Sequence, residues 1–437
     1  MQLRRLVCGV SSAGLGILLL TAPAHAQATS RVSVDSSGAE GNGNSFGPTA
    51  ISADGRIVAF VSSATNLVAV DANGYGDVFV HDRLTGTTQR VSVDSSGAEA
   101  NGESDDPAIS ADGRYVAFRS NASNLVAGDA NGYGDVFVHD RLTGITERVS
   151  VDSSGAEGTD ESYGPAIAAD GQRVAFESYA SNLVGGDTNQ SGDVFVHDRS
   201  TGITERVSVN SSGVAGNDRS FDPAISADGQ SVSFQSYASN LVAGDTNGYM
   251  DVFVHDRSTG LTERVSVSSS GKQGSVQGNS YSAASTISAN GQIVAFWSRA
   301  TNLVKGDTNG ANDVFVHDRS TGITVRVSVD SHGKQGNANS SLNGPQLSAD
   351  GQIVAFVSSA TNLVSNDRNG GSDVFIHDRS TGLTERVSVN SSGAESNYPS
   401  FDPSISADGQ IVAFDSAAWN FVSGDTNGYL DVFVHER

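Results

Sequence analysis

The stretch Asp193-Val194-Phe195-Val196-His197-Asp198 decides the fold, because it occurs six more times in the chain with almost no change. Neighbouring copies lie 58 to 62 residues apart, a spacing too regular to arise by chance. The sequence is therefore an array of seven repeats. The other copies begin at Asp77, Asp135, Asp251, Asp313, Asp373 and Asp431.

Each repeat contains four short segments with the composition of β-strands. In the third repeat we expect strands at residues 166–168, 174–176, 194–197 and 203–209, with an Asp-Gly hairpin turn between the first two. Helical periodicity is absent from residues 27–437. Apolar strands repeated in this way need cover on both faces, which neighbouring sheets provide in a β-propeller. The prediction is an all-β, seven-bladed propeller of four-stranded antiparallel blades.

The two ends of the array favour a closed ring. A lone fourth strand, Arg31-Val32-Ser33-Val34, precedes the first repeat, and the last repeat stops at His435-Glu436-Arg437, after its third strand. We therefore expect the first strand to complete the last blade. Such closure removes the open sheet edges that promote aggregation.

Residues 1–26 have the features of a secretory signal peptide. Arg4 and Arg5 precede an apolar run through Leu20, and Ala24-His25-Ala26 offers a cleavage site. We expect export to the periplasm or the extracellular space, with residues 27–437 forming one propeller domain and no segment that spans a membrane. The only cysteine, Cys8, would be removed, so the mature protein would contain no disulfide.

The charge of the chain restricts its partners. There are 49 acidic and 26 basic residues, a formal charge of −23, and removal of Arg4 and Arg5 would lower it by two more. A polyanion would be repelled, so nucleic acid is not an expected partner. A cation, a cationic surface or a neutral glycan remains compatible, and we expect a monomer.

The repeats resemble a known family. Ser-Ala-Asp-Gly at 52–55, Val-Ala-Phe at 58–60 and the Asp-Val-Phe-Val-x-Asp stretch are similar to the WD40-like PD40 repeats of TolB-type propellers, and the resemblance covers residues 31–437. It implies the propeller fold. The family usually has Pro where this chain has Ala53, Ala111 and their equivalents, and the present repeats have longer loops.

A second motif, D-x-N-x-x-x-D, precedes the third strand of every repeat. Its oxygen-bearing side chains resemble the first part of a calcium loop, but position 12 would be Asp82, beyond a strand of roughly 16 Å. The alternative is an Asx-turn, in which Asp71 accepts backbone N–H groups and Asn73-Gly74 reverses the chain. We favour the turn and no cofactor, with calcium as the alternative. The candidate metal-binding residues are Asp71, Asn73, Asp77, Asp129, Asn131, Asp135, Asp187, Asn189, Asp193, Asp245, Asn247, Asp251, Asp307, Asn309, Asp313, Asp367, Asn369, Asp373, Asp425, Asn427 and Asp431.

Seven histidines share one repeat position in the third strand. That strand lies about 10 Å outside the innermost one, so equivalent histidines cannot converge on one metal ion. We expect them to be packing residues. They are His81, His139, His197, His255, His317, His377 and His435.

Recognition of one ligand needs residues that differ between blades. The position after each Val-Ala-Phe-like segment varies, and we expect it on the face of the long interblade loops; a merely variable rim is the alternative. The candidate ligand-binding residues there, together with neighbours two positions on, are Arg119, Glu177, Tyr179, Gln235, Tyr237, Trp297, Arg299 and Asp415.

These observations favour a secreted, non-catalytic propeller that binds a glycan, a peptide or an envelope protein through its loop-rich face. One alternative is a hydrolase or lyase with an active site in the central channel, and another is a calcium-stabilised surface or adhesion protein. A blade-specific acid/base set directed at the axis would favour the enzyme. Glu177 and Asp415 are the only two carboxylates at the variable position.

Overall fold

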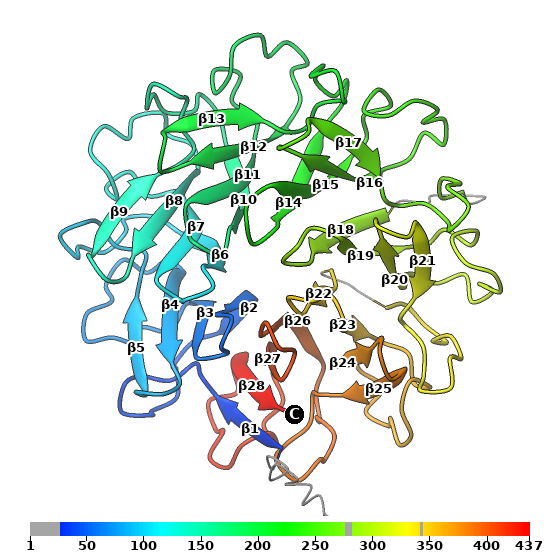
Figure 1. Ribbon diagram of the computed structural model, residues 1–437. Coiled ribbons are helices and arrows are strands. Elements are labelled where there is room, and N and C mark those ends of the chain that lie inside the picture. Colours follow the sequence, from blue (N-terminus) through cyan, green and yellow to red (C-terminus); the bar gives the residue numbers. More distant parts are fainter. Residues whose placement is uncertain (1–26, 276–281, 341–343) are drawn as a thin grey trace, which may run out of the picture.

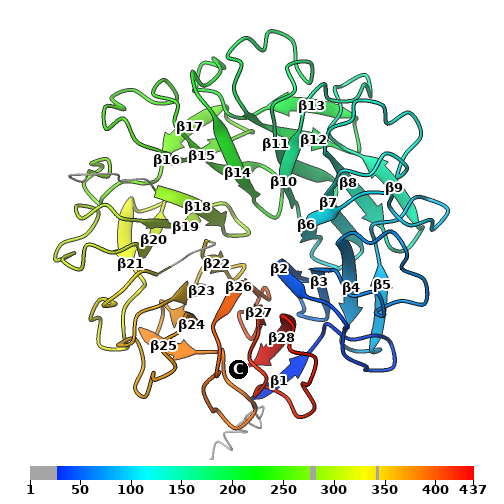
Figure 2. The same cartoon turned by 180° about the vertical axis from the view of Figure 1, so that it is seen from behind.

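Seven four-stranded antiparallel sheets stand in a ring around a central axis (Figures 1 and 2). The computed structural model describes residues 27–275, 282–340 and 344–437, so the expected signal peptide lies outside the described residues. The described residues contain no helix, and none therefore that is long and apolar enough to cross a membrane. The predicted all-β, seven-bladed propeller is confirmed.

Each blade runs from an inner strand beside the axis to an outer fourth strand. The inner strands are β2 (Ser45–Ile51), β6 (Ser104–Ile109), β10 (Ser162–Ile167), β14 (Ser220–Ile225), β18 (Ser282–Ile287), β22 (Gln346–Leu347) and β26 (Ser400–Ile405). The second strands are β3 (Ile57–Ser62), β7 (Tyr115–Ser120), β11 (Arg173–Ser178), β15 (Ser231–Ser236), β19 (Ile293–Ser298), β23 (Ile353–Ser358) and β27 (Ile411–Ser416). The third strands are β4 (Asp77–Asp82), β8 (Asp135–Asp140), β12 (Asp193–Asp198), β16 (Asp251–Asp256), β20 (Asp313–Asp318), β24 (Asp373–Asp378) and β28 (Asp431–Glu436). The outer strands are β5 (Thr87–Arg90), β9 (Ile145–Arg148), β13 (Ile203–Arg206), β17 (Leu261–Arg264), β21 (Ile323–Arg326), β25 (Leu383–Arg386) and β1 (Ala28–Arg31).

Two strand boundaries differ from the sequence prediction by three residues or more, and the other boundaries by no more than two. The inner strand β10 begins at Ser162 rather than at 166, because a register shift between Tyr163 and Ala166 lets the strand continue past an irregular stretch. The outer strand β13 ends at Arg206 rather than at 209, because Val209 bridges to Ala215 inside the interblade loop.

The ring closes as predicted, through pairing of β1 with β28, which places Thr29 opposite His435 (Figure 1). The predicted position of the closing strand, 31–34, was wrong by three residues. Residues 32–34 have strand composition, but they follow β1 as Val-Ser-Val follows every outer strand, and Ser33 donates a hydrogen bond to Asp431 at 2.5 Å.

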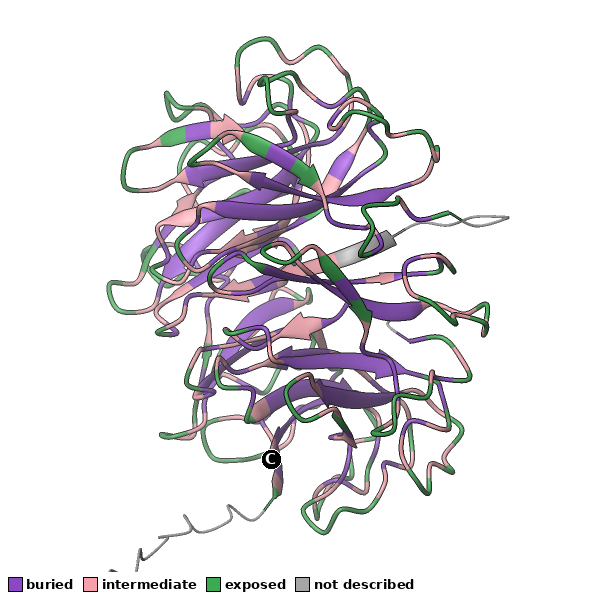
Figure 3. Ribbon diagram, turned by 45° about the vertical axis from the view of Figure 1, so that its right-hand side comes forward, coloured by how far each residue is buried: buried purple, intermediate pink, exposed green. Residues whose placement is uncertain are grey.

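Neighbouring blades supply each other's cover. Val194 and Val196 of blade 3 pack in one buried cluster with Phe234 of blade 4, and Phe176 of blade 3 packs in another with Val138 of blade 2. The second and third strands are mostly buried, whereas the outer strands and the loops carry exposed residues (Figure 3). The core therefore lies between the blades, as the apolar strands required.

One face of the ring is joined by a circuit of backbone hydrogen bonds. In each turn between the inner and second strands, an alanine N–H donates to the carbonyl of the equivalent alanine in the next blade, with N···O distances of 2.9 to 3.0 Å. Proline has no N–H, so alanine at the position where the family usually has proline allows every turn to donate. We call these residues the amide ring: Ala53, Ala111, Ala169, Ala227, Ala289, Ala349 and Ala407.

The repeated histidines are packing residues with satisfied hydrogen bonds. His139 is buried, and its Nδ1 lies 2.8 Å from Thr146 Oγ1. The single hydroxyl proton of Thr146 is donated to Val93 O, so the histidine must be the donor in its own bond and carries its proton on Nδ1. Burial lowers the pKa of His139 and keeps the ring neutral. The same arrangement links His197, Thr204 and Val151.

Candidate functional site

The ends of the second strands lie on the face that carries the interblade loops. Tyr179 N donates to Glu161 O at 3.0 Å, and Tyr237 N donates to Arg219 O at 3.0 Å, so each strand end is tied to the loop that leads into its own blade. The variable residues therefore lie at one face, around one end of the axial channel, although Glu177, Gln235 and Asp415 are themselves buried.

Arg119, on β7 of blade 2, reaches towards blade 3. Its guanidinium lies 3.3 Å from Asp105, 3.0 Å from Glu161 and 4.6 Å above the ring of Tyr163. The two carboxylates and the ring hold this side chain in place, so its charge is already compensated within the protein.

Glu177, on β11 of blade 3, is buried with 3% exposure and faces blade 4. Its Oε1 accepts hydrogen bonds from Arg219 Nε at 3.0 Å and Nη2 at 2.7 Å. Burial raises the pKa of Glu177 to about 7, against the lowering effect of Arg219, and Asp222 raises it further. Glu177 can therefore exchange a proton near neutral pH.

Aromatic rings continue across blades 3 and 4. Tyr163 and Tyr179 meet edge to face at 6.4 Å, Arg219 lies over Tyr179 and Phe221 at 5.4 and 4.4 Å, and Phe221 stacks on Tyr237 at 6.0 Å. Tyr179 is 37% exposed and Tyr237 is 49% exposed. We call these four rings the aromatic row.

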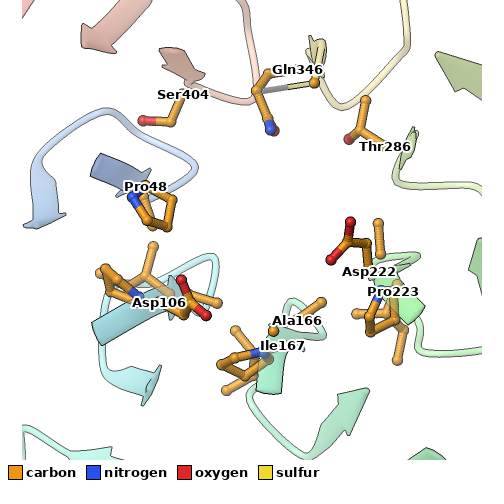
Figure 4. Close-up of a pocket in the computed structure, with 18 of the residues that line it drawn as sticks. Pro48, Asp106, Ala166, Ile167, Asp222, Pro223, Thr286, Gln346 and Ser404 are labelled. Atoms are coloured by element: carbon orange, nitrogen blue, oxygen red, sulfur yellow. The ribbon is translucent and has the colours of Figure 1, made fainter. Parts of the chain in front are cut away.

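The inner strands contribute carboxylates that the sequence prediction missed. Asp106 and Asp222 adopt φ angles of 49° and 47° at the register shift of their strands, and Gly164 has φ 54° at the same position between them. Asp tolerates this conformation better than most residues, and a bulge redirects its side chain. Both carboxylates point towards the middle of the channel (Figure 4). The signal in the sequence is an Asp or Gly before Pro at one fixed repeat position, seen again in Gly344 and Asp402.

These residues enclose a side pocket at the end of the channel. The channel itself has a volume of about 470 Å³ and is lined by the inner strands of all seven blades. The side pocket measures about 380 Å³, and we call it the mouth pocket. Its lining residues come from blades 2, 3 and 4: Asp106, Tyr163, Gly164, Glu177, Tyr179, Arg219 and Asp222.

The structure gathers some of the predicted residues and separates others. Glu177 and Tyr179 line the mouth pocket, and Gln235 donates to Asp222 Oδ2 at 2.8 Å. Asp415 is buried on blade 7, where burial and then Asp402 raise its pKa to about 7. Glu177 and Asp415 thus belong to different blades, and only Glu177 lines the mouth pocket.

Trp297 and Arg299 lie on blade 5, outside the mouth pocket. Trp297 is half-buried rather than fully exposed, and Arg299 Nε donates to Gly310 O at 3.2 Å. The pair stands one blade beyond Tyr237, which ends the aromatic row.

The Asp-Asn loop of blade 1 contains an Asx-turn, but on a different residue from the one expected. Asn73 Oδ1 accepts the N–H of Tyr75 at 2.8 Å, and Asn73 Nδ2 donates to Asp77 Oδ2 at 3.1 Å. We expected Asp71 to accept hydrogen bonds from backbone N–H groups of the loop. Glu99 accepts them instead, from Ala72 N at 3.0 Å and from Asn73 N at 3.1 Å. Glu99 comes from the following interblade loop, which a single-repeat motif does not include.

Three carboxylate groups in the described residues could hold a metal ion, because their ligand atoms lie within 4.8 Å of one another. In the first, however, Arg90 Nη1 lies 3.7 Å from Asp71, 3.2 Å from Asp77 and 2.8 Å from Glu99. The guanidinium therefore occupies the place of a cation. Burial raises the pKa of Asp71 to about 6, and the neighbouring Asp77 raises it further against the lowering effect of Arg90. The other two groups are Asp129, Asp135 and Glu157, and Asp367, Asp373 and Glu395.

No protein-family model and no curated protein matches the sequence. Among solved structures, an oligogalacturonate lyase in complex with manganese matches with 12% identity over 94% of this chain and 90% of its own, with a TM-score of 0.54. The β-propeller domain of the Trilobed protease from Pyrococcus furiosus matches with 11% identity over 90% of this chain and 93% of its own, with a TM-score of 0.52. TolB from Acinetobacter baumannii matches with 18% identity over 71% of this chain, which spans 58% of TolB, with a TM-score of 0.41.

The likenesses to the lyase and to the protease propeller support the β-propeller fold and nothing more specific. Propellers with different activities share it, so function has to be argued from the site.

Proposed function

We propose that this protein is an exported, non-catalytic β-propeller that binds a glycan, a peptide or an envelope protein at the mouth pocket and the aromatic row. The observation that carries the proposal is that residues that differ between blades meet at one pocket. The repeats are nearly invariant, yet Arg119, Glu177 and Gln235, which differ between blades, all hold or line one pocket on one face. The expected signal peptide at 1–26 supports export.

The chemistry of the surface suits recognition. Exposed Tyr rings combined with Arg form the contacts that contribute most to binding at protein interfaces, and Tyr faces also stack on sugars. Tyr179 and Tyr237 are held by Tyr163 and Phe221, so little side-chain freedom would be lost on binding.

The test is a screen of glycans and envelope extract against the parent and the double variant Tyr179→Ala, Tyr237→Ala. We expect the variant to lose at least tenfold in affinity for the ligand found, while its melting temperature stays within a few degrees of the parent. Trp419→Ala is the matched control, because Trp419 is 62% exposed on blade 7, away from the mouth pocket. Unchanged binding by the double variant would refute the proposal. A parallel variant, Trp297→Ala with Arg299→Ala, measures whether the ligand extends to blade 5.

One observation favours the enzymatic alternative. Glu177 has a pKa of about 7 and lies in a pocket with two further carboxylates, Asp106 and Asp222, which is the blade-specific acid set that a channel enzyme needs. Against catalysis, both Arg219 bonds are made to one Glu177 oxygen and restrain it. Cleavage of a polysaccharide or peptide by the parent, lost in Glu177→Gln, would establish the enzyme instead.

A further inference from the structure

The mouth pocket contains an unfilled position between two carboxylates. Asp106, Gly164 and Asp222 occupy equivalent places in blades 2, 3 and 4, with nearly equal φ angles. Gly164 has no side chain, and a Cβ built on it would touch only Pro223, at 4.0 Å. The space between the two Asp residues is therefore open, and Figure 4 shows both carboxylates turned towards the channel.

The charges around this space do not balance. Arg219 is engaged by Glu177, and Arg119 is engaged by Asp105 and Glu161. Asp222 Oδ2 accepts a hydrogen bond from the neutral side-chain amide of Gln235 at 2.8 Å. Among the described residues, no basic side chain forms a hydrogen bond with Asp222. Burial raises the pKa of Asp106 and of Asp222, against the lowering effects of Arg119 and of Arg219, although Asp222 is open to the channel.

The walls of the pocket are of a kind that attracts cations. Tyr163 and Tyr179 line the pocket, and each ring has a guanidinium over it, Arg119 at 4.6 Å and Arg219 at 5.4 Å, which shows that these rings accept cations. Aromatic faces next to carboxylates in a recess bind ammonium groups through combined cation–π and ionic attraction. The recess also concentrates the negative field of the channel.

We propose that the mouth pocket binds the side-chain ammonium group of a lysine carried by a protein or peptide ligand. The inference rests on the proposed function and names the chemistry of its ligand. A lysine ammonium is a compact point charge with three donors on a long flexible stem, so it suits an open space between two carboxylates better than the planar arginine fork does. The neighbouring ligand residues lie across Tyr179 and Tyr237.

The probes are three pools of synthetic heptapeptides with mixed flanking residues and a central lysine, acetyl-lysine or arginine. Each pool is selected on immobilised full-length protein in low salt, and the best lysine peptide is then measured by calorimetry. We expect the lysine pool to yield binders, acetylation of the selected peptide to weaken binding at least tenfold, and 0.5 M salt to weaken it further.

The variants separate this pocket from the general acidity of the surface. Asp222→Asn keeps the shape and tolerates the same φ, and we expect it to weaken the lysine peptide at least fivefold. Asp402→Asn is the matched control, since Asp402 has φ 48° at the equivalent position of blade 7 and does not line the mouth pocket; it should bind within twofold of the parent.

Equal recovery from the acetyl-lysine pool, stronger binders from the arginine pool, or equal effects of Asp222→Asn and Asp402→Asn would each overturn the inference. If the ligand from the functional screen depends on Tyr179 and Tyr237 but not on Asp222, the proposed function stands and the lysine assignment is wrong. If no ligand depends on the tyrosines, the proposed function itself fails.

Discussion

At the scale of single residues, a buried arginine joins three separate motifs. Arg90, at the end of β5, contacts Asp71 and Asp77 of the Asp-Asn loop and Glu99 of the interblade loop. Asp77 is fully buried and also accepts from Ser92 Oγ at 2.6 Å. An internal cation therefore offsets the charge of the carboxylates in this acidic motif.

Arg90→Met tests this explanation. Removing one partner of a buried charge group costs about 3 to 5 kcal/mol, so the variant should melt well below the parent. Because three carboxylates then face each other, millimolar calcium should restore part of the loss, whereas the parent should melt alike in calcium and in chelator.

Arg206→Met is the control for that experiment. Blade 3 has Ala215 where blade 1 has Glu99, so only Asp187 and Asp193 remain to bind an ion. Thermal melts should show destabilisation with less recovery in calcium. A large rise in the melting temperature of the parent with calcium would contradict the internal-cation account.

At the scale of elements, the inner hairpin turns set how closely blades approach. Gly351, in the turn before β23, has φ 69°, and a Cβ on it would lie 2.7 to 2.9 Å from carbon atoms of Ile293 in the preceding blade. Ile293 is buried with 8% exposure and has little room to move. Glycine here therefore serves both the turn and the contact between blades.

Gly351→Ala should destabilise the protein more than Gly333→Ala. Both positions have a positive φ, which costs a non-glycine residue roughly 1 kcal/mol, but a Cβ at Gly333 would meet nothing within 4 Å. The clash at Gly351 should add about 1 to 3 kcal/mol. Chemical denaturation of the two variants measures the difference in their free energies of unfolding. Equal losses of stability would show that Ile293 moves aside without destabilising the protein.

The strands and their order could be predicted from the sequence because the repeat period and the apolar segments are local signals. The closing strand was misplaced because Val32-Ser33-Val34 and Ala28-Thr29-Ser30-Arg31 can be told apart only by alignment with Ile203-Thr204-Glu205-Arg206. Glu177 was recognised as variable, but its partner Arg219 lies 42 residues away on another blade. The direction of Asp222 depends on a bulge; the Asp or Gly before Pro at this repeat position marks the bulge but does not give the direction of the side chain.

At the scale of the whole molecule, the chain ends meet within blade 7. Thr29 Oγ1 donates to Val389 O at 2.5 Å and contacts His435 Nδ1 at 2.9 Å, while Arg31 lies 3.0 Å from Asp431. Strand β1 is therefore the outer strand of blade 7. It also makes a hydrogen bond to the interblade loop at Val389, and its Arg31 is the cation of one acidic cluster.

A chain that starts at Val32 should lose all three contributions. With β28 left as an open edge, we expect a melting temperature lower by many degrees and association that increases with protein concentration. Scanning calorimetry and light scattering against a chain that starts at Gln27 provide the comparison. Identical melting curves would show that β1 does not hold the ring closed.

The amide ring has a consequence of its own. Its bond from Ala407 to Ala53 crosses the junction between the last and first blades with the same 2.9 Å length as bonds elsewhere in the circuit. On this face, the junction between the last and first blades is therefore bonded like the other six junctions between blades. The circuit of hydrogen bonds has no first or last blade. A circularly permuted gene, opened at another interblade loop and joined between Arg437 and Ala28, would encode the same circuit.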